Sequence, residues 1–144
     1  MPKETVALAS DHAGLDLKET LKKELTEMGY PVLDLGTNSS ESVDYPDYGT
    51  KLGEAVAAGK AAKGVAVCGS GIGISIAANK VRGIRAALIH DVTGARLSRL
   101  HNDANVIAFG ARTTGVDVAK EALKVFLATE FEGGRHTRRV EKLG

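Results

Sequence analysis

The residues with the clearest capacity for chemistry lie between Cys68 and Gly73. Cys68 is the only cysteine, glycines follow it at positions 69, 71 and 73, and Ser70 and Ile72 stand between them. Glycine lets the main chain adopt positive φ angles, and a helix that starts here would offer unpaired N–H groups and a partial positive charge. The pattern therefore favours an anion at this turn and a thiolate that acts as a base or nucleophile.

A lone cysteine is more often a small buried hydrophobe than a reactive group. Here its position favours chemistry. The apolar run at 65–67 predicts a strand directly before Cys68, and Ile72, Ile76 and Ala77 recur at helical spacing after it. Because ligands bind at the carboxyl ends of strands in open α/β sheets, we interpret Cys68 as part of a site.

The same unit of an apolar strand and an amphipathic helix recurs along the chain. Strands are predicted at 5–10, 31–35, 65–67, 85–89 and 106–109, and helices at 15–25, 48–62, from 72, at 92–100 and at 116–127. Nearly continuous apolar strands must be covered on both faces. The sequence therefore predicts a single α/β domain over residues 1–144, a three-layer α/β/α (Rossmann-like) fold with a five-stranded parallel sheet.

Composition narrows the classes of function. The chain has 144 residues, a net charge of +1, no Trp and one Cys. A balanced charge and few aromatic residues argue against a nucleic-acid partner, and one cysteine cannot form an intramolecular disulfide. No apolar run approaches a membrane span or a signal segment, so we expect a cytoplasmic protein without membrane contact. The charge is unbalanced only locally, in a strongly basic stretch at 134–139.

Other polar residues follow or precede predicted strands. They are Asp11, His12, His90, His101, Asn102 and Arg112. Several of the loops 11–14, 68–73, 90–91, 101–105 and 110–112 are expected to converge at one edge of the sheet. Plainer alternatives stay open: Asp11 could cap a helix, His12 could be a solvated loop residue, and Tyr45 could anchor the long loop at 36–46.

Several known motifs do not fit. A phosphate-binding P-loop needs Lys directly after its last glycine, but Ile74 follows Gly73. The glycine spacing is G-x-G-x-G rather than that of dinucleotide sites, so a non-catalytic nucleotide-binding module remains only an alternative. His90, His101 and Cys68 lack metal-ligand spacing, and Gly69-Ser70-Gly71 is not a hydrolase elbow, so we expect no metal site.

Five segments together resemble a known family. They are the sequences at 10–14, 43–47 and 68–80, the pair His101-Asn102, and the sequence at 132–136. In this order, across nearly the whole chain, they are similar to ribose-5-phosphate isomerase type B. The resemblance implies an enzyme of the pentose phosphate pathway that interconverts ribose 5-phosphate and ribulose 5-phosphate through an enediolate, without cofactor or metal.

The resemblance also implies roles for single residues. Cys68 would be the base at C1 and C2, Ser70 would relay the hydroxyl proton at a position where the family often has Thr, and His101 would open the sugar ring. Substrate contacts are implied for Asp11, His12, Tyr45, Gly69, Gly71, Ile72, Gly73 and Asn102, and phosphate contacts for Arg112, Arg135 and Arg139.

Family members act as dimers with shared sites. The resemblance therefore implies a homodimer, with a tetramer left open, and places the basic tail at 130–144 at the dimer interface. It leaves two related activities as alternatives, the isomerisation of galactose 6-phosphate and that of allose 6-phosphate.

Overall fold

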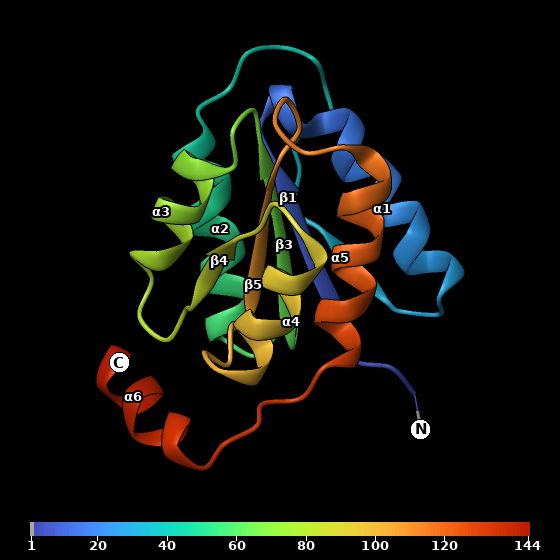
Figure 1. Cartoon of the computed structure of the whole chain (residues 1–144). Coiled ribbons are helices and arrows are strands. Elements are labelled where there is room, and N and C mark those ends of the chain that lie inside the picture. The colour runs from blue at the N-terminus through green and yellow to red at the C-terminus, as the bar shows by residue number, and fades with distance from the viewer. Residues whose placement is uncertain (1) are drawn as a thin grey trace.

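A computed structural model describes residues 2–144 of the protein. It contains one five-stranded sheet in which every pairing is parallel (Figure 1). The strands are β1 (Val6–Ser10), β2 (Val32–Asp34), β3 (Lys63–Cys68), β4 (Ala86–Leu88) and β5 (Val106–Gly110). Their spatial order is β2-β1-β3-β5-β4, so β3 lies at the centre. The predicted five-stranded parallel sheet is confirmed.

Helices cover both faces of this sheet, as the apolar strands require. They are α1 (Leu15–Glu27), α2 (Tyr45–Ala57), α3 (Ile72–Asn79), α4 (Val92–Leu100), α5 (Val116–Ala128) and α6 (Arg135–Leu143), with a short 3-10 turn at His12–Gly14. One core cluster contains residues of α1, α4 and α5, and the other contains residues of α2 and α3. The three-layer α/β/α architecture is therefore confirmed.

The central strands divide their side chains by size between the two faces. Leu8, Val65 and Phe109 pack with α1 and α5, whereas Ala9, Ala66 and Cys68 pack with α2 and α3. Successive side chains of a strand point to opposite faces, so this division follows from sequence position alone. Cys68 consequently faces the layer formed by α2 and α3.

Two predicted helix boundaries were wrong. The second helix starts at Tyr45 rather than at residue 48, because Pro46 is compatible with a first helical turn. It ends at Ala57 rather than at residue 62, and Gly59 follows with a φ of +78°. The basic tail contains a helix, α6, which starts after Gly133 and Gly134, both with positive φ.

The polar loops lie at two opposite edges of the sheet. Loops 11–14, 68–73, 90–91 and 110–112 follow strands and meet at the carboxyl edge. The loop at 101–105 precedes β5 and therefore lies at the amino edge, where the Asn105 carbonyl accepts a hydrogen bond from Gly64 N at 2.9 Å. Four of the five loops therefore meet at one edge, as expected for several of them, and the fifth lies at the other edge. Figure 1 shows α6 at the same amino end.

Among residues 2–144, no helix is long and apolar enough to span a bilayer.

Candidate active site

The turn after β3 holds the thiol of Cys68 in a network of main-chain groups. Its side chain is 4% exposed, and the amide of Gly71 donates a hydrogen bond to Sγ at 3.2 Å. The amide of Ile72 donates to Ser70 Oγ, also at 3.2 Å. Two N–H groups at the start of α3 are therefore directed at Cys68 and Ser70, the groups expected to exchange protons.

Glycine is required at two positions of this turn. Gly71 has a φ of +77°, and a Cβ there would lie 2.7 Å from the carbonyl carbon of Phe109 and 2.6 Å from a methyl group of Leu88. A Cβ on Gly73 would overlap the ring of Tyr45. The glycines therefore let β5 and the Tyr45 ring approach the turn closely.

The loop after β5 is joined to the turn through main-chain hydrogen bonds. Ala111 N donates to Cys68 O and Arg112 N donates to Gly69 O, each at 2.9 Å. The Arg112 guanidinium lies against Gly69. A Cβ placed on Gly69 would be 3.1 Å from Arg112 Nη1. This arrangement brings a permanent positive charge to the glycine turn.

Asp11 and His12 follow β1 at the same edge. Asp11 is buried, and its Oδ1 accepts a hydrogen bond from Gly14 N at 3.1 Å. It therefore caps the 3-10 turn at His12–Gly14 and not the helix α1, whose N-cap is Gly14. Val43 N donates to Nδ1 of His12 at 3.1 Å. A neutral His12 must then carry its proton on Nε2, since Nδ1 is the acceptor.

These residues surround one cavity of about 550 Å³. Its lining includes the predicted residues Asp11, His12, Tyr45, Cys68, Gly69, Ser70, Ile72, Gly73 and Arg112. A cavity of this size suits a small ligand. Sequence reasoning missed Ala13, Ile76 and Thr113, which also line it. Ile76 could have been found, because it lies one helical turn after Ile72.

Gly71, which was also predicted to contact the substrate, is buried in the turn and does not line this cavity, and neither do the remaining predicted residues. His101 caps the C-terminus of α4, and Asn102 lines a second cavity of about 430 Å³ with Leu143 of α6. Arg135 and Arg139 are exposed on α6. Within one chain, the Cys68 and His101 groups therefore lie at opposite edges of the sheet.

His136, at the start of α6, stacks on His101. The two ring centroids are 4.4 Å apart and the planes differ by 16°. His136 is buried, and burial, followed by the charges of His101 and Arg135, holds its pKa below the usual value of 6.5. Glu132 completes a group with one donor atom from each side chain, all within 4.8 Å, that could hold a metal ion.

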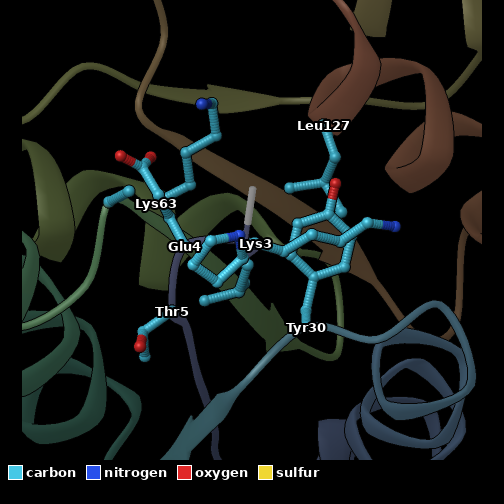
Figure 2. Close-up of a pocket in the computed structure, with 9 residues that line it drawn as sticks. Lys3, Glu4, Thr5, Tyr30, Lys63 and Leu127 are labelled. Carbon is cyan, nitrogen blue, oxygen red and sulfur yellow. The ribbon is translucent and has the colours of Figure 1, made fainter.

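A third cavity, of about 320 Å³, lies beside the first residues of β1 and β3 (Figure 2). Lys3 Nζ stands 4.6 Å from the centre of the Tyr30 ring, and burial, followed by the charge of Arg99, lowers the pKa of Lys63. The lining is Pro2, Lys3, Glu4, Thr5, Val6, Tyr30, Ala62, Lys63 and Leu127. It includes none of the predicted site residues.

Comparison with known proteins agrees with the geometry. The family model described as ribose/galactose isomerase matches residues 6–143. A ribose-5-phosphate isomerase B of Escherichia coli is 47% identical over 138 residues, covering 96% of this chain and 93% of the relative. A D-erythrulose-4-phosphate isomerase of Pectobacterium atrosepticum is 43% identical, covering 97% and 93%.

Solved structures extend the likeness to three dimensions. A ribose-5-phosphate isomerase B of Clostridium thermocellum superposes with a TM-score of 0.96 at 50% identity, covering 97% of this chain and 95% of that one. The match to the family model, over residues 6–143, spans both edges of the sheet, including the glycine turn and α6. On this evidence the chain belongs to the ribose/galactose isomerase family.

Proposed function

We propose that this chain interconverts ribose 5-phosphate and ribulose 5-phosphate through an enediolate. Its family and the relatives named ribose-5-phosphate isomerase support this activity. The observation that carries the chemistry is the Cys68 thiol, which accepts a hydrogen bond from a helix N-terminal amide beside a cavity of about 550 Å³. A sulfur held there can take and return a proton on a bound sugar.

In the proposed reaction, the Cys68 thiolate removes the proton from C2 of the open-chain aldose. The electron pair left at C2 forms the C1–C2 double bond, and negative charge moves to O1. Ser70 carries the hydroxyl proton from O2 to O1, and Cys68 returns its proton to C1. The product is the ketose, and because C2 is oxidised as C1 is reduced, no external oxidant or reductant is needed.

The developing oxygen charge requires stabilisation. We assign this role to the main-chain amides between Gly69 and Gly73, at the start of α3. Preorganised donors of this kind contribute several kcal/mol to acyl-transfer and enolisation reactions, roughly 3 kcal/mol for each donor. Asp11, His12 and Tyr45, which line the same cavity, are assigned to the sugar.

Ring opening must precede this step, and we assign it to His101 of a second copy. Histidine exchanges protons near neutral pH. Since His101 and Cys68 lie at opposite edges within one chain, a site that uses both needs two chains. We therefore propose a homodimer in which residues 130–144 lie at the interface and Asn102 contacts substrate oxygens. A tetramer built from two such dimers is compatible with this arrangement.

Exposed apolar residues beside the cavity support an interface there. Ile72 is 53% exposed and Ile76 is 55% exposed, and both belong to the cavity lining. Covering them with a second copy would remove apolar surface from water. The partner's α6 would bring Arg135 and Arg139 toward the phosphate, opposite Arg112, as planar guanidinium groups that suit phosphate oxygens.

The direct test is proton NMR of ribose 5-phosphate in D2O with the wild-type protein and with Cys68→Ala. We expect the wild type to form ribulose 5-phosphate with exchange at the reacting carbons, and Cys68→Ala to do neither. An unchanged sugar with the wild type would refute the assignment of substrate. Normal turnover by Cys68→Ala would return the thiol to a packing role.

Other sugar phosphates define the second candidate activity, because one relative is named for D-erythrulose 4-phosphate and the family name includes galactose. Rates on erythrulose 4-phosphate, allose 6-phosphate and galactose 6-phosphate should therefore be measured beside ribose 5-phosphate. We expect the highest kcat/KM with ribose 5-phosphate. We further propose that the reaction belongs to the pentose phosphate pathway and takes place in the cytoplasm.

A further inference from the structure

Asp103 lies in a main-chain conformation that its residue type rarely adopts. Its φ is +47°, and within residues 2–144 it is the only residue other than glycine with a positive φ. This left-handed region is unfavourable for residues with a Cβ, and helices that end in it usually place glycine there. Asp103 stands three positions after the end of α4, directly after His101 and Asn102. A costly conformation beside predicted site residues points to a function.

Two arginines from different elements hold the Asp103 side chain. Arg99, in the last turn of α4, places Nη1 2.7 Å from Asp103 Oδ1, and Arg85, just before β4, places Nη2 3.3 Å from Oδ2. Arg85 Nε also donates to the Asp103 carbonyl at 2.8 Å. Charge-assisted hydrogen bonds of this kind are about twice as strong as neutral ones. A glycine would adopt the same φ freely but would lose both carboxylate contacts, so this position depends on the side chain.

Arg99 also connects this turn to the segment that leads to α6. Its side chain is only 9% exposed, and Nη1 donates to Ala104 O at 2.8 Å. Its Nε donates to Thr129 O, directly after α5, at 3.0 Å. The centre of the guanidinium lies 5.9 Å from the centre of the Phe126 ring. One buried arginine thus ties the loop that carries His101 to the chain between α5 and α6.

Main-chain hydrogen bonds complete the turn on both sides of Asp103. Its amide donates to Arg99 O at 3.3 Å, and Ala104 N donates to Ser98 O at 2.9 Å. Both bonds return the chain to the last turns of α4, and residues 101 and 102 lie between their ends. The direction in which these two residues leave the helix therefore depends on the conformation of Asp103.

We propose that Asp103 is a positioning residue for the His101 half of the active site. Arg85 and Arg99 hold its left-handed main chain. That main chain sets the direction in which His101 and Asn102 leave α4 and approach the substrate bound to a second copy. In this role Asp103 touches no reacting atom. The inference rests on the proposed function, since it assigns Asp103 to a site shared between two chains.

Substitutions at the two ends of α4 separate positioning from stability. Asp103→Ala removes both ion pairs and disfavours the positive φ, so we expect kcat/KM for ribose 5-phosphate to fall by about tenfold to a hundredfold. Asp103→Asn tolerates the left-handed conformation and keeps one acceptor oxygen, so its kcat/KM should lie between that of Asp103→Ala and the wild type. Circular dichroism confirms that both variants are folded.

Asp91→Ala is the matched control. Asp91 caps the other end of α4, where its Oδ1 accepts a hydrogen bond from Gly94 N at 2.7 Å. Loss of this cap should lower the melting temperature by about 4 °C and leave kcat/KM unchanged. A loss of kcat/KM in Asp103→Ala that is no larger than in Asp91→Ala would overturn the proposal.

The orientation of the His101 ring is measured by proton NMR, independently of turnover. The chain has four histidines, and the ring signals that disappear in His101→Ala identify His101. Because His101 stacks on His136 at 4.4 Å, its signals include a ring-current shift that depends on the orientation of both rings. We expect Asp103→Ala to move these signals and Asp91→Ala to leave them in place. Unchanged His101 signals in Asp103→Ala would contradict a positioning role.

Mixing two variants shows which half of the site Asp103 serves. A mixed dimer of Asp103→Ala with Cys68→Ala has one site with both an intact thiol and an intact His101 edge. After random exchange of chains, this mixture should therefore reach about a quarter of wild-type activity. A mixture of Asp103→Ala with His101→Ala has both defects at the same edge, so it should show only the mean activity of its parents.

A reference mixture separates failure of this proposal from failure of the proposed function. Cys68→Ala mixed with His101→Ala should also recover about a quarter of wild-type activity. If the reference recovers and the mixture of Asp103→Ala with Cys68→Ala does not, Asp103 does not serve the His101 half. If the reference fails although mass spectrometry confirms exchange, the shared site of the proposed function is wrong, whereas moved His101 signals in Asp103→Ala would still support the positioning of that ring.

Discussion

The two edges of the sheet both carry histidine and arginine side chains, but they are assembled differently. At the carboxyl edge, consecutive residues from Cys68 to Gly73 form the turn, and main-chain amides organise it. At the amino edge, His101 and His136 are 35 positions apart in the sequence and meet through ring stacking. The first region is shaped by local main-chain geometry and the second by the placement of a terminal helix.

This difference predicts that neither edge of a single chain carries the whole proposed site. The cavity at the carboxyl edge is lined within a single chain by most of the residues expected to contact the sugar. The amino edge has His101, Asn102 and the arginines of α6, but not the thiol. In the proposed homodimer, each edge would therefore supply half of the site, and the two halves would complement each other across the two chains.

The largest expected effect is recovery of activity from two inactive proteins. Cys68→Ala and His101→Ala should each be nearly inactive, because each dimer then lacks the base or the ring-opening group at both sites. After random exchange of chains, about half of the dimers are mixed and each has one intact site of two, so activity should reach about a quarter of wild type. Mass spectrometry verifies the exchange. Confirmed mixing without recovery would show that the two edges do not share a site.

The next effect concerns main-chain geometry at the carboxyl edge. Gly71→Ala must adopt a φ of +77° and place its methyl group 2.7 Å from the Phe109 carbonyl carbon. The turn must shift, and the hydrogen bond to Cys68 Sγ shifts with it, so we expect kcat to fall by about tenfold to a hundredfold.

Gly83→Ala is the matched control for that variant. Gly83 has a φ of +89°, but nothing lies within 4 Å of a Cβ placed there. Both variants have a similar cost of about 1 kcal/mol for the left-handed conformation, whereas only Gly71→Ala should lose kcat. Equal kcat values in the two variants would mean that the turn does not organise the thiol.

The same contrast explains what could be predicted from the sequence. The five strands, their parallel pairing and the turn at Cys68 were predictable, because hydrophobic periodicity and glycine spacing act over a few neighbouring residues. The meeting of Asp11, His12 and Arg112 with the Cys68 turn was predictable too, since polar residues after parallel strands meet at one edge.

What could not be predicted depended on distant segments. The stacking of His136 on His101 requires Gly133 and Gly134 to turn the chain back toward α4, and no spacing rule connects these positions. The sequence did not assign the loop at 101–105 to an edge, because a polar loop before a strand has the same composition as one after a strand.

Substitution of the arginines should have an intermediate effect on KM, and it tests whether both edges contact the same substrate. Arg112→Lys at the carboxyl edge and Arg135→Lys on α6 should each raise KM for ribose 5-phosphate by about tenfold, because lysine cannot form the paired hydrogen bonds of a guanidinium with phosphate. Arg138→Lys, an exposed neighbour outside the predicted set, should leave KM unchanged. A normal KM in Arg135→Lys would remove α6 from the substrate site.

The smallest effect on activity is expected where an ion pair supports the loop over the cavity. Lys18 is fully buried, and its Nζ lies 2.7 Å from Asp34 Oδ1 and 3.1 Å from Asn38 Oδ1. The loop that starts here also contains Val43, whose amide binds His12. Asp34→Asn should therefore change kcat/KM only a few-fold, but it should lower the free energy of unfolding by about 2 to 3 kcal/mol, because it leaves a buried ammonium less well paired.

The contribution of the Asp34 carboxylate to the free energy of unfolding should depend on pH, and the direction follows from the pKa of this carboxyl. Burial alone would raise the pKa of Asp34, but hydrogen bonds from Lys18, the Gly36 amide and Lys22 outweigh it and hold the pKa below its usual 3.8. The pair therefore stabilises the fold fully above that value and loses its effect as pH falls through the lower, folded pKa. In urea titrations the gap between wild type and Asp34→Asn should narrow below about pH 4. A gap that stays constant there would mean that the carboxylate charge does not hold the loop, and that the carboxyl edge is organised by main-chain contacts alone.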